Sequence, residues 1–252
     1  MRPNSFVSPP VEKLDVAGKE PVQTPSDALP NSDLLGALGR LVRGLSLLFW
    51  ILPIALVTCW QTAEGDWFRP LGILPPVLAT GLLIYALQLL SHFQKQERVW
   101  HIALDRSRLF AFVNLGLAPF LYWSNRVAHP FLNAMEHVMF VSGLCFLYSL
   151  NPVLWRLAAM LPDETLRLET KLFTNVNRYV LAVTIVLSTA YIALTWVFPH
   201  IRVALPISPR VMTALIWVTL FLFLLPVAMT MALTWKIKEA IFASIFGSGA
   251  ER

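Results

Sequence analysis

The chain has 252 residues, of which 56% are hydrophobic and 14% are charged, whereas soluble domains average about 45–50% and about 25%. This composition excludes a soluble globular protein, because too few polar side chains remain to cover its surface. The net charge of +5 does not indicate a nucleic-acid partner, since the chain has no run of basic residues and no arginine-rich helix. Its two cysteines, Cys59 and Cys145, fall at different depths of the predicted spans, so we expect two free thiols.

Residues 1–34 precede the first apolar block and contain six prolines, scattered charges and no apolar periodicity. This composition is typical of disorder, so we predict a disordered cytoplasmic tail. The segment lacks the basic start, apolar core and cleavage site of a signal peptide, so we expect the first span to act as an uncleaved anchor.

Six apolar stretches follow, each close to the ~20 residues that a helix needs to cross ~30 Å of hydrocarbon. They predict an all-α membrane protein, in which residues 35–252 form one bundle of six transmembrane helices. The third stretch is the shortest, and we expect its helix to begin in the polar segment Arg98–Arg108, which has no helix breaker. The predicted spans lie near residues 43–61, 72–92, 109–124, 132–154, 179–198 and 211–234.

A short polar segment separates the fourth and fifth spans. Residues Asp163–Phe173 follow Pro162 and have acids early and a lysine late. This order suits the dipole of a short interfacial helix, which could contact a partner or the lipid surface.

Lysines and arginines divide unequally between the two sides of the predicted spans, with thirteen near the spans on one side and four on the other. Cytoplasmic loops carry the excess of positive charge, so both termini are predicted to be cytoplasmic. We expect a multi-pass protein of a bacterial inner (plasma) membrane. The thirteen are Arg40, Arg43, Lys95, Arg98, Arg106, Arg108, Arg156, Arg167, Lys171, Arg178, Lys236, Lys238 and Arg252, and the four are Arg69, Arg126, Arg202 and Arg210.

Glu136 and His137 begin the fourth span, where charged and ionisable side chains are costly and commonly functional. Glu136 could accept a proton or bind a metal in an outward-open cavity. The alternative is that it lies at headgroup depth and pairs with Arg126 or reaches toward water. His129 shares a helical face with Glu136 only if the helix continues through Pro130, and two ligands do not make a site, so no metal site is predicted.

Polar side chains also recur at helical spacing on the second and fifth spans. Each set lies on one face, which either lines an aqueous path or joins helices by hydrogen bonds. The set on the second span is Gly81, Tyr85, Gln88 and His92, and the set on the fifth is Thr184, Ser188, Tyr191 and Thr195.

Asn114 and Asn151 are amides predicted to lie at the same depth, on the third and fourth spans. Because an unpaired amide is expensive in hydrocarbon and a short loop joins these spans, we predict that the two side chains hydrogen-bond to each other.

No phosphate-binding glycine loop, nucleophile elbow or histidine arrangement for haem occurs in the sequence. The sequence therefore predicts no cofactor and does not favour an enzyme.

Polar stripes together with prolines in or beside the spans favour a permease-like protein or a membrane-complex subunit for a small solute, a lipid or a partner chain. A membrane-embedded enzyme using Glu136 and nearby histidines, and a structural or assembly factor, stay open as alternatives. The expected partners are the lipid bilayer and another membrane protein or a second copy, but not nucleic acid. The prolines are Pro53, Pro75, Pro76, Pro119, Pro152 and Pro226.

Overall fold

The structure, a computed structural model, describes residues 29–65, 67–93, 97–127, 129–161, 164–197 and 209–246. Within these residues the protein is all helical, as predicted, with six long helices and one short 3₁₀ helix, η2 (Arg69–Leu71). The long helices are α1 (Leu29–Glu64), α2 (Leu74–Ser91), α3 (Arg98–Ser124), α4 (Pro130–Ala159), α5 (Glu164–Val197) and α7 (Pro209–Phe246).

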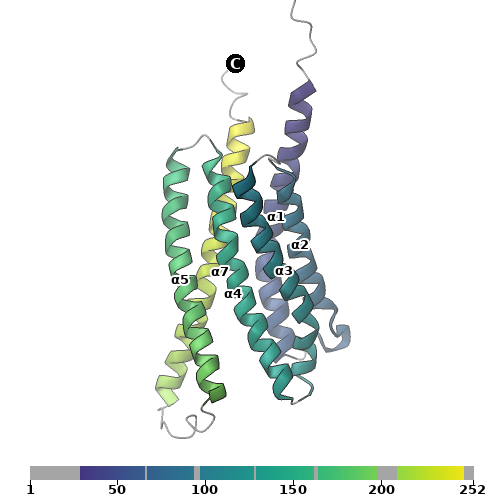
Figure 1. Cartoon of the computed structure of the whole chain (residues 1–252), viewed down its shortest axis with the longest axis vertical. Coiled ribbons are helices and arrows are strands. Elements are labelled where there is room, and N and C mark those ends of the chain that lie inside the picture. The colour runs from purple at the N-terminus through teal and green to yellow at the C-terminus, as the bar shows by residue number, and fades with distance from the viewer. Residues whose placement is uncertain are drawn as a thin grey trace, which may run out of the picture.

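Successive long helices run in opposite directions and pack side by side (Figure 1). The last helix, α7, packs against α5 and also against α1, which closes the six helices into one bundle. In addition, α4 contacts α7, so α4, α5 and α7 meet one another. The start of α1 and the end of α7 lie at the same end of the bundle (Figure 1).

Five of the described helices are long and apolar enough to cross a membrane by length and composition, which supports a membrane-embedded bundle. The five candidate spans lie within α1, α2, α4, α5 and α7. The remaining helix, α3, carries four charged residues in its segment Arg98–Arg108 and is less apolar as a result. Helix α3 nevertheless packs between α2 and α4 in the bundle. A sixth crossing, by α3, therefore stays a prediction.

The starts of two helices follow from the local sequence. Helix α3 begins at Arg98, within the polar segment that precedes the third apolar stretch. Helix α4 begins at Pro130, where a proline costs no intrahelical hydrogen bond, and the ring of His129 accepts a hydrogen bond from the amide of Phe131.

Two boundaries differ from the predicted ones. Helix α1 begins at Leu29, so the last part of the predicted tail is helical, and residues 1–28 lie outside the described residues. The predicted short interfacial helix at Asp163–Phe173 is wrong, because its described residues from Glu164 onward belong to one uninterrupted α5. No glycine or proline stands between Glu164 and Val197 to end the first turns as a separate helix.

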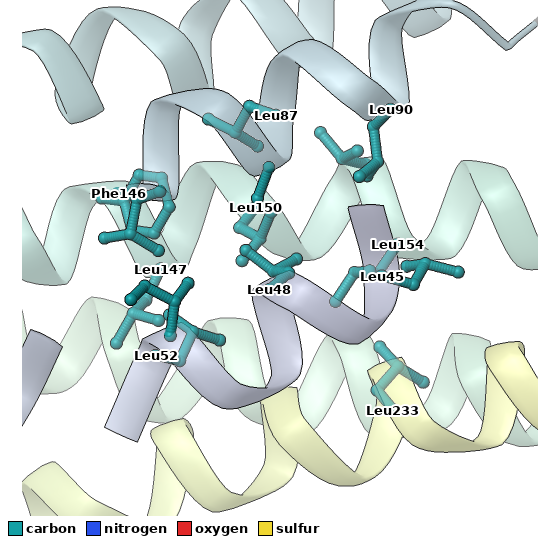
Figure 2. Close-up of a cluster of buried hydrophobic side chains, with 14 of the residues drawn as sticks. Leu45, Leu48, Leu52, Leu87, Leu90, Phe146, Leu147, Leu150, Leu154 and Leu233 are labelled. Carbon is teal, nitrogen blue, oxygen red and sulfur yellow. The ribbon is translucent and has the colours of Figure 1, made fainter. Parts of the chain in front are cut away.

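A core of leucines fills the bundle between α1, α2, α4 and α7 (Figure 2). Leu48 of α1 lies close to Leu150 of α4, with Leu87 of α2 beside them (Figure 2). These three side chains are fully buried. One side of α4 therefore packs against α1 and α2 through apolar contacts.

Helices α1 and α2 are in close contact at Gly44. A Cβ atom placed on Gly44 would lie 2.5 Å from Cδ1 of Leu90, 3.1 Å from Cβ of Leu89 and 3.3 Å from the carbonyl oxygen of Ala86. Only a residue without a side chain fits this contact without a shift of the neighbouring helix.

Basic residues gather at the end of the bundle where α1 begins and α7 ends, which we call the basic end. Arg98 begins α3 there, Arg156 lies in the last turn of α4, and Lys236 and Lys238 lie in the final part of α7. The antiparallel packing thus brings together charges that are far apart in the sequence. Whether the basic end is cytoplasmic stays a prediction.

Candidate functional site

Three buried polar side chains from three helices meet between α4, α5 and α7. The side-chain nitrogen of Asn177 donates to Oδ1 of Asn151 at 3.0 Å and to Oγ1 of Thr230 at 3.0 Å. The same nitrogen lies 3.4 Å from the carbonyl oxygen of Pro226. Each of the three side chains is at most 1% exposed. We call Asn151, Asn177 and Thr230 the amide cluster.

Prolines adjoin the amide cluster on two of its helices. Pro152 directly follows Asn151 on α4, and Pro226 lies one turn before Thr230 on α7. Proline has no amide hydrogen, so each removes one hydrogen bond of its helix. Additional bonds to backbone carbonyls form nearby, since Asn151 donates to Leu147 at 2.8 Å and Thr230 donates to Pro226 at 2.7 Å. The cluster therefore lies where the backbone hydrogen bonding of α4 and α7 is interrupted.

A row of buried oxygens on α5 continues the amide cluster toward the basic end. Oγ1 of Thr170, Oγ1 of Thr174 and Oδ1 of Asn177 are buried and have no hydrogen-bond partner among the described residues. Their spacing of four and three residues puts them on one face of the helix. By contrast, the buried hydroxyls of Thr184 and Thr234 each donate to the carbonyl four residues earlier. We call the three oxygens the α5 oxygen row.

The amide cluster lies near the basic end of the bundle. At 1.5 Å per residue, Asn151 is about 30 Å from the start of α4, Thr230 about 30 Å from the start of α7 and Asn177 about 30 Å from the end of α5. These starts and ends all lie at the end opposite to the basic end (Figure 1). Because ~30 Å is also the thickness of the hydrocarbon layer, the stretch of each helix between the cluster and that opposite end is long enough to cross a membrane.

Beside the amide cluster, α5 makes polar contacts with both of its neighbours, α4 and α7. Arg178 donates through Nη2 to the hydroxyl of Tyr148 on α4 at 2.9 Å, and its guanidinium carbon lies 4.9 Å from the centre of that ring. On the other side, Nζ of Lys236 on α7 is 2.6 Å from Oε2 of Glu169. The amide cluster is thus flanked by one cation–π contact and one ion pair.

The predicted hydrogen bond between Asn114 and Asn151 is not formed. Asn114 is buried, but its Oδ1 has no hydrogen-bond partner among the described residues. Asn151 bonds to Asn177 and to the carbonyl of Leu147. Asn151 bonds to α5 and not to its hairpin partner α3, because an equal depth in the bundle does not determine which neighbouring helix a side chain faces.

The predicted polar stripes are largely directed away from the bundle interior. On α2, Tyr85, Gln88 and His92 are exposed and Gly81 is half-buried, while the ring of His92 bonds to the carbonyl of Gln88 at 2.8 Å. On α5, Thr184 is buried, Ser188 is half-buried and Tyr191 is 59% exposed, while the side chain of Thr195 lies outside the described residues. Helix α2 packs on α1 and α3, whereas α5 packs on α4 and α7, so the two stripes do not face each other.

Glu136 and His137 are both half-buried in the second turn of α4. The ring of His137 is 2.6 Å from the carbonyl oxygen of Asn133, which occupies one of its nitrogens. Arg126 lies over the ring of Tyr122 at 4.2 Å and does not form the predicted ion pair with Glu136 in the described part of the chain. Among the described residues, no group of three or more histidine, cysteine or acidic side chains could hold a metal ion.

Comparison of the chain with protein-family models, curated proteins and solved structures finds no match.

Asn177 and Thr230 are the members of the site that the sequence interpretation missed. The spacing of Thr170, Thr174 and Asn177 already placed three polar groups on one helical face. However, Thr170 falls in the predicted interfacial segment Asp163–Phe173, and Thr174 and Asn177 precede the fifth predicted span, so the polarity of these residues requires no explanation in that prediction. Only the contact with Asn151 and Thr230 shows that this face is buried.

Proposed function

We propose that this chain is a permease-like membrane protein that handles a small polar solute at the amide cluster and the α5 oxygen row. The observation that carries the proposal is the burial of three oxygens that have no hydrogen-bond partner among the described residues. Leaving a buried polar group without a partner costs about 1–3 kcal/mol. A solute with hydroxyl or amino groups would donate hydrogen bonds to these oxygens and offset that cost.

The chemical character of the described cluster favours binding over catalysis. Its side chains are two amides and a hydroxyl, which donate and accept hydrogen bonds at any physiological pH. General acid–base catalysis uses groups that titrate near the working pH. Prolines beside the cluster resemble the interrupted helices on which transporters build binding sites. In this proposal the basic end is cytoplasmic and the protein belongs to a bacterial inner (plasma) membrane.

A ligand screen on the purified full-length protein tests this function. Thermal unfolding in a neutral detergent is recorded with a panel of uncharged polyols, sugars and zwitterionic amino acids. A solute that binds only the folded state at 100 times its Kd stabilises it by about 2.7 kcal/mol. We expect at least one solute to raise the unfolding temperature and to be taken up by proteoliposomes containing the protein.

Two threonines of α5 provide a matched pair of variants for the screen. Thr174→Val removes a buried hydroxyl of the α5 oxygen row, whereas Thr184→Val removes a buried hydroxyl that already bonds to Val180. We expect Thr174→Val to weaken the response to the solute at least tenfold and Thr184→Val to leave it unchanged. Equal responses of both variants and the original protein would place the solute elsewhere and contradict the proposal.

A second candidate function is that of a subunit in a membrane complex, favoured by exposed leucines near the basic end. Leu168 and Leu172 of α5 are 70% and 66% exposed. They lie about 13 Å and about 7 Å beyond Asn177 toward the basic end, where lipid chains do not reach if the amide cluster marks the membrane boundary. Exposed apolar side chains in such a position indicate a protein contact.

The oligomeric state distinguishes this second candidate. Native mass spectrometry of the protein purified from mild detergent should then show a second copy or a co-purifying chain. The variant with Leu168→Ser and Leu172→Ser should lose that species while its unfolding temperature stays the same. A strictly monomeric mass for the original protein, with no co-purifying chain, argues against the subunit function.

A further inference from the structure

Arg178 is a half-buried cation between α5 and α4 that has no carboxylate partner among the described residues. Its Nη2 bonds to the hydroxyl of Tyr148, and its Nε is buried without a hydrogen-bond partner. Removing a charged group from water is unfavourable unless an opposite charge and hydrogen bonds replace the water. Tyr148 supplies a hydrogen bond and a π face, but no negative charge. The surroundings of Arg178 therefore favour an anion.

Further basic residues share the face of α5 on which Arg178 lies. Arg167, Lys171, Thr174 and Arg178 follow one another at spacings of four, three and four residues, which puts them on one side of the helix. Between Arg167 and Arg178 the only acidic residue of α5 is Glu169, and it is paired with Lys236 on α7. This face of α5 is consequently positive along about three turns.

Thr174 adds a hydrogen-bond donor to this face. It lies one turn before Arg178, and its buried hydroxyl has no partner among the described residues. A hydroxyl beside a guanidinium is a donor pair suited to phosphate oxygens, since charge-assisted hydrogen bonds to an oxyanion are stronger than neutral ones. The positive charge of Arg178 disfavours the alternative of a bound cation.

The depth of Arg178 follows if the far end of α5 lies at the opposite surface of the membrane. Arg178 is the neighbour of Asn177, which lies about 30 Å from the opposite end of α5. With that placement, a cation one hydrocarbon thickness from the far end of its helix stands beside the phosphate groups of the nearer leaflet. Basic pockets between transmembrane helices at this level are suited to anionic headgroups.

We propose that the α4–α5 interface at the basic end binds a phosphate-type oxyanion. Arg178 is its charged anchor, Thr174 donates a hydrogen bond, and Lys171 and Arg167 attract the anion from the water side. The headgroup of an anionic phospholipid and free inorganic phosphate share this chemistry, and the depth of Arg178 favours the phospholipid. The inference rests on Arg178 and shares only Thr174 with the proposed solute site, so Arg178→Gln and the anionic ligands test it separately from that site.

Binding measurements on the full-length protein in neutral detergent test the proposal. Thermal unfolding and native mass spectrometry are recorded with added phosphatidylglycerol, phosphatidylcholine or inorganic phosphate. Arg178→Gln removes the anchor, and Arg126→Gln is the matched control, because Arg126 also lies over a tyrosine ring but lies just after the end of α3, at the end of the bundle opposite to the basic end. We expect Arg178→Gln to bind phosphatidylglycerol at least tenfold more weakly than the original protein, and Arg126→Gln to bind it within twofold.

The three additives distinguish the sources of the anion. Binding of phosphatidylglycerol above that of phosphatidylcholine assigns the site to an anionic headgroup, whereas binding of inorganic phosphate without lipid assigns it to a free anion. Either result, if sensitive to Arg178, supports an oxyanion site. If Arg178→Gln does not fold, exposed Lys171 provides the second variant, and Lys171→Gln should weaken binding about threefold at low salt, where surface charges are least screened. The proposal fails if neither ligand binds, or if the folded variants at positions 171 and 178 bind both ligands as the original protein does.

Discussion

Asn177 of α5 donates a hydrogen bond to Asn151 of α4 at 3.0 Å, and both side chains are buried. The two residues are 26 positions apart in the chain. The same nitrogen of Asn177 also reaches Thr230 of α7, so one amide joins three helices. This contact explains why polar residues can be buried where α4, α5 and α7 meet.

The first prediction concerns the energetic coupling of these two amides. Asn177→Leu should lower the free energy of unfolding in detergent by about 1–3 kcal/mol, because it leaves Oδ1 of Asn151 buried without a donor. Asn151→Leu added to Asn177→Leu should cost much less than it does alone, since the shared hydrogen bond is already lost. As a control, Asn114→Leu and Asn151→Leu should have additive effects, because these side chains are not bonded to each other. Additive losses at positions 151 and 177 would show that their hydrogen bond contributes nothing measurable.

The second prediction compares two buried threonines. Thr230→Val removes an acceptor of Asn177 and should lower the free energy of unfolding by about 1–2 kcal/mol. Thr174→Val removes a hydroxyl that has no partner among the described residues, so it should leave stability unchanged or raise it by up to about 1 kcal/mol. Both replacements preserve the shape of the side chain, so packing changes little. Chemical unfolding of the two variants in the same detergent measures the difference, and a larger loss for Thr174→Val would contradict the assignment.

The third prediction concerns the contact of α1 with α2. Gly44→Ala forces the side chain of Leu90 to shift and presses against Leu89 and the backbone of Ala86, so it should cost about 1–3 kcal/mol of stability. Gly143→Ala is the matched control, because an added Cβ at Gly143 on α4 meets no atom within 4 Å. That control should leave stability unchanged or raise it by up to ~1 kcal/mol through the greater helix propensity of alanine. Thermal unfolding of both variants measures the comparison, and equal effects would mean that α1 and α2 are less closely packed at this position.

The fourth prediction concerns the orientation of the helices and the sixth crossing. Reporter fusions at positions 100, 165 and 245 should report the cytoplasm, and fusions near 66, 127 and 203 should report the external side. Positions 100 and 127 flank α3, so opposite signals there show that α3 crosses the membrane. The same signal at both positions would leave α3 on one surface and would contradict both the six-span bundle and the cytoplasmic placement of both termini.

The helices themselves were largely predictable from the sequence. Long apolar blocks must form helices in a membrane, because only a helix or a closed barrel satisfies its own backbone hydrogen bonds there. The starts of α3 at Arg98 and of α4 at Pro130 follow from local chemistry, namely an absent helix breaker and a proline in the first turn. Such features depend on residues adjacent in the chain, so no knowledge of packing is needed to read them.

The faces that these helices bury were decided by the tertiary structure. In a soluble protein the apolar face of a helix marks the interior, but in a membrane the lipid is as apolar as the core, so periodicity defines a face without giving its direction. The polar face containing Tyr85 and Gln88 therefore lies on the outside of the bundle, whereas the face containing Thr174 and Asn177 is buried between helices. For the same reason, the periodicity did not show that the hydrogen-bond partner of Asn151 lies on α5 and not on α3. Its hydrogen bond depends on which helices surround α4 and how they are rotated, and packing sets both across the whole bundle.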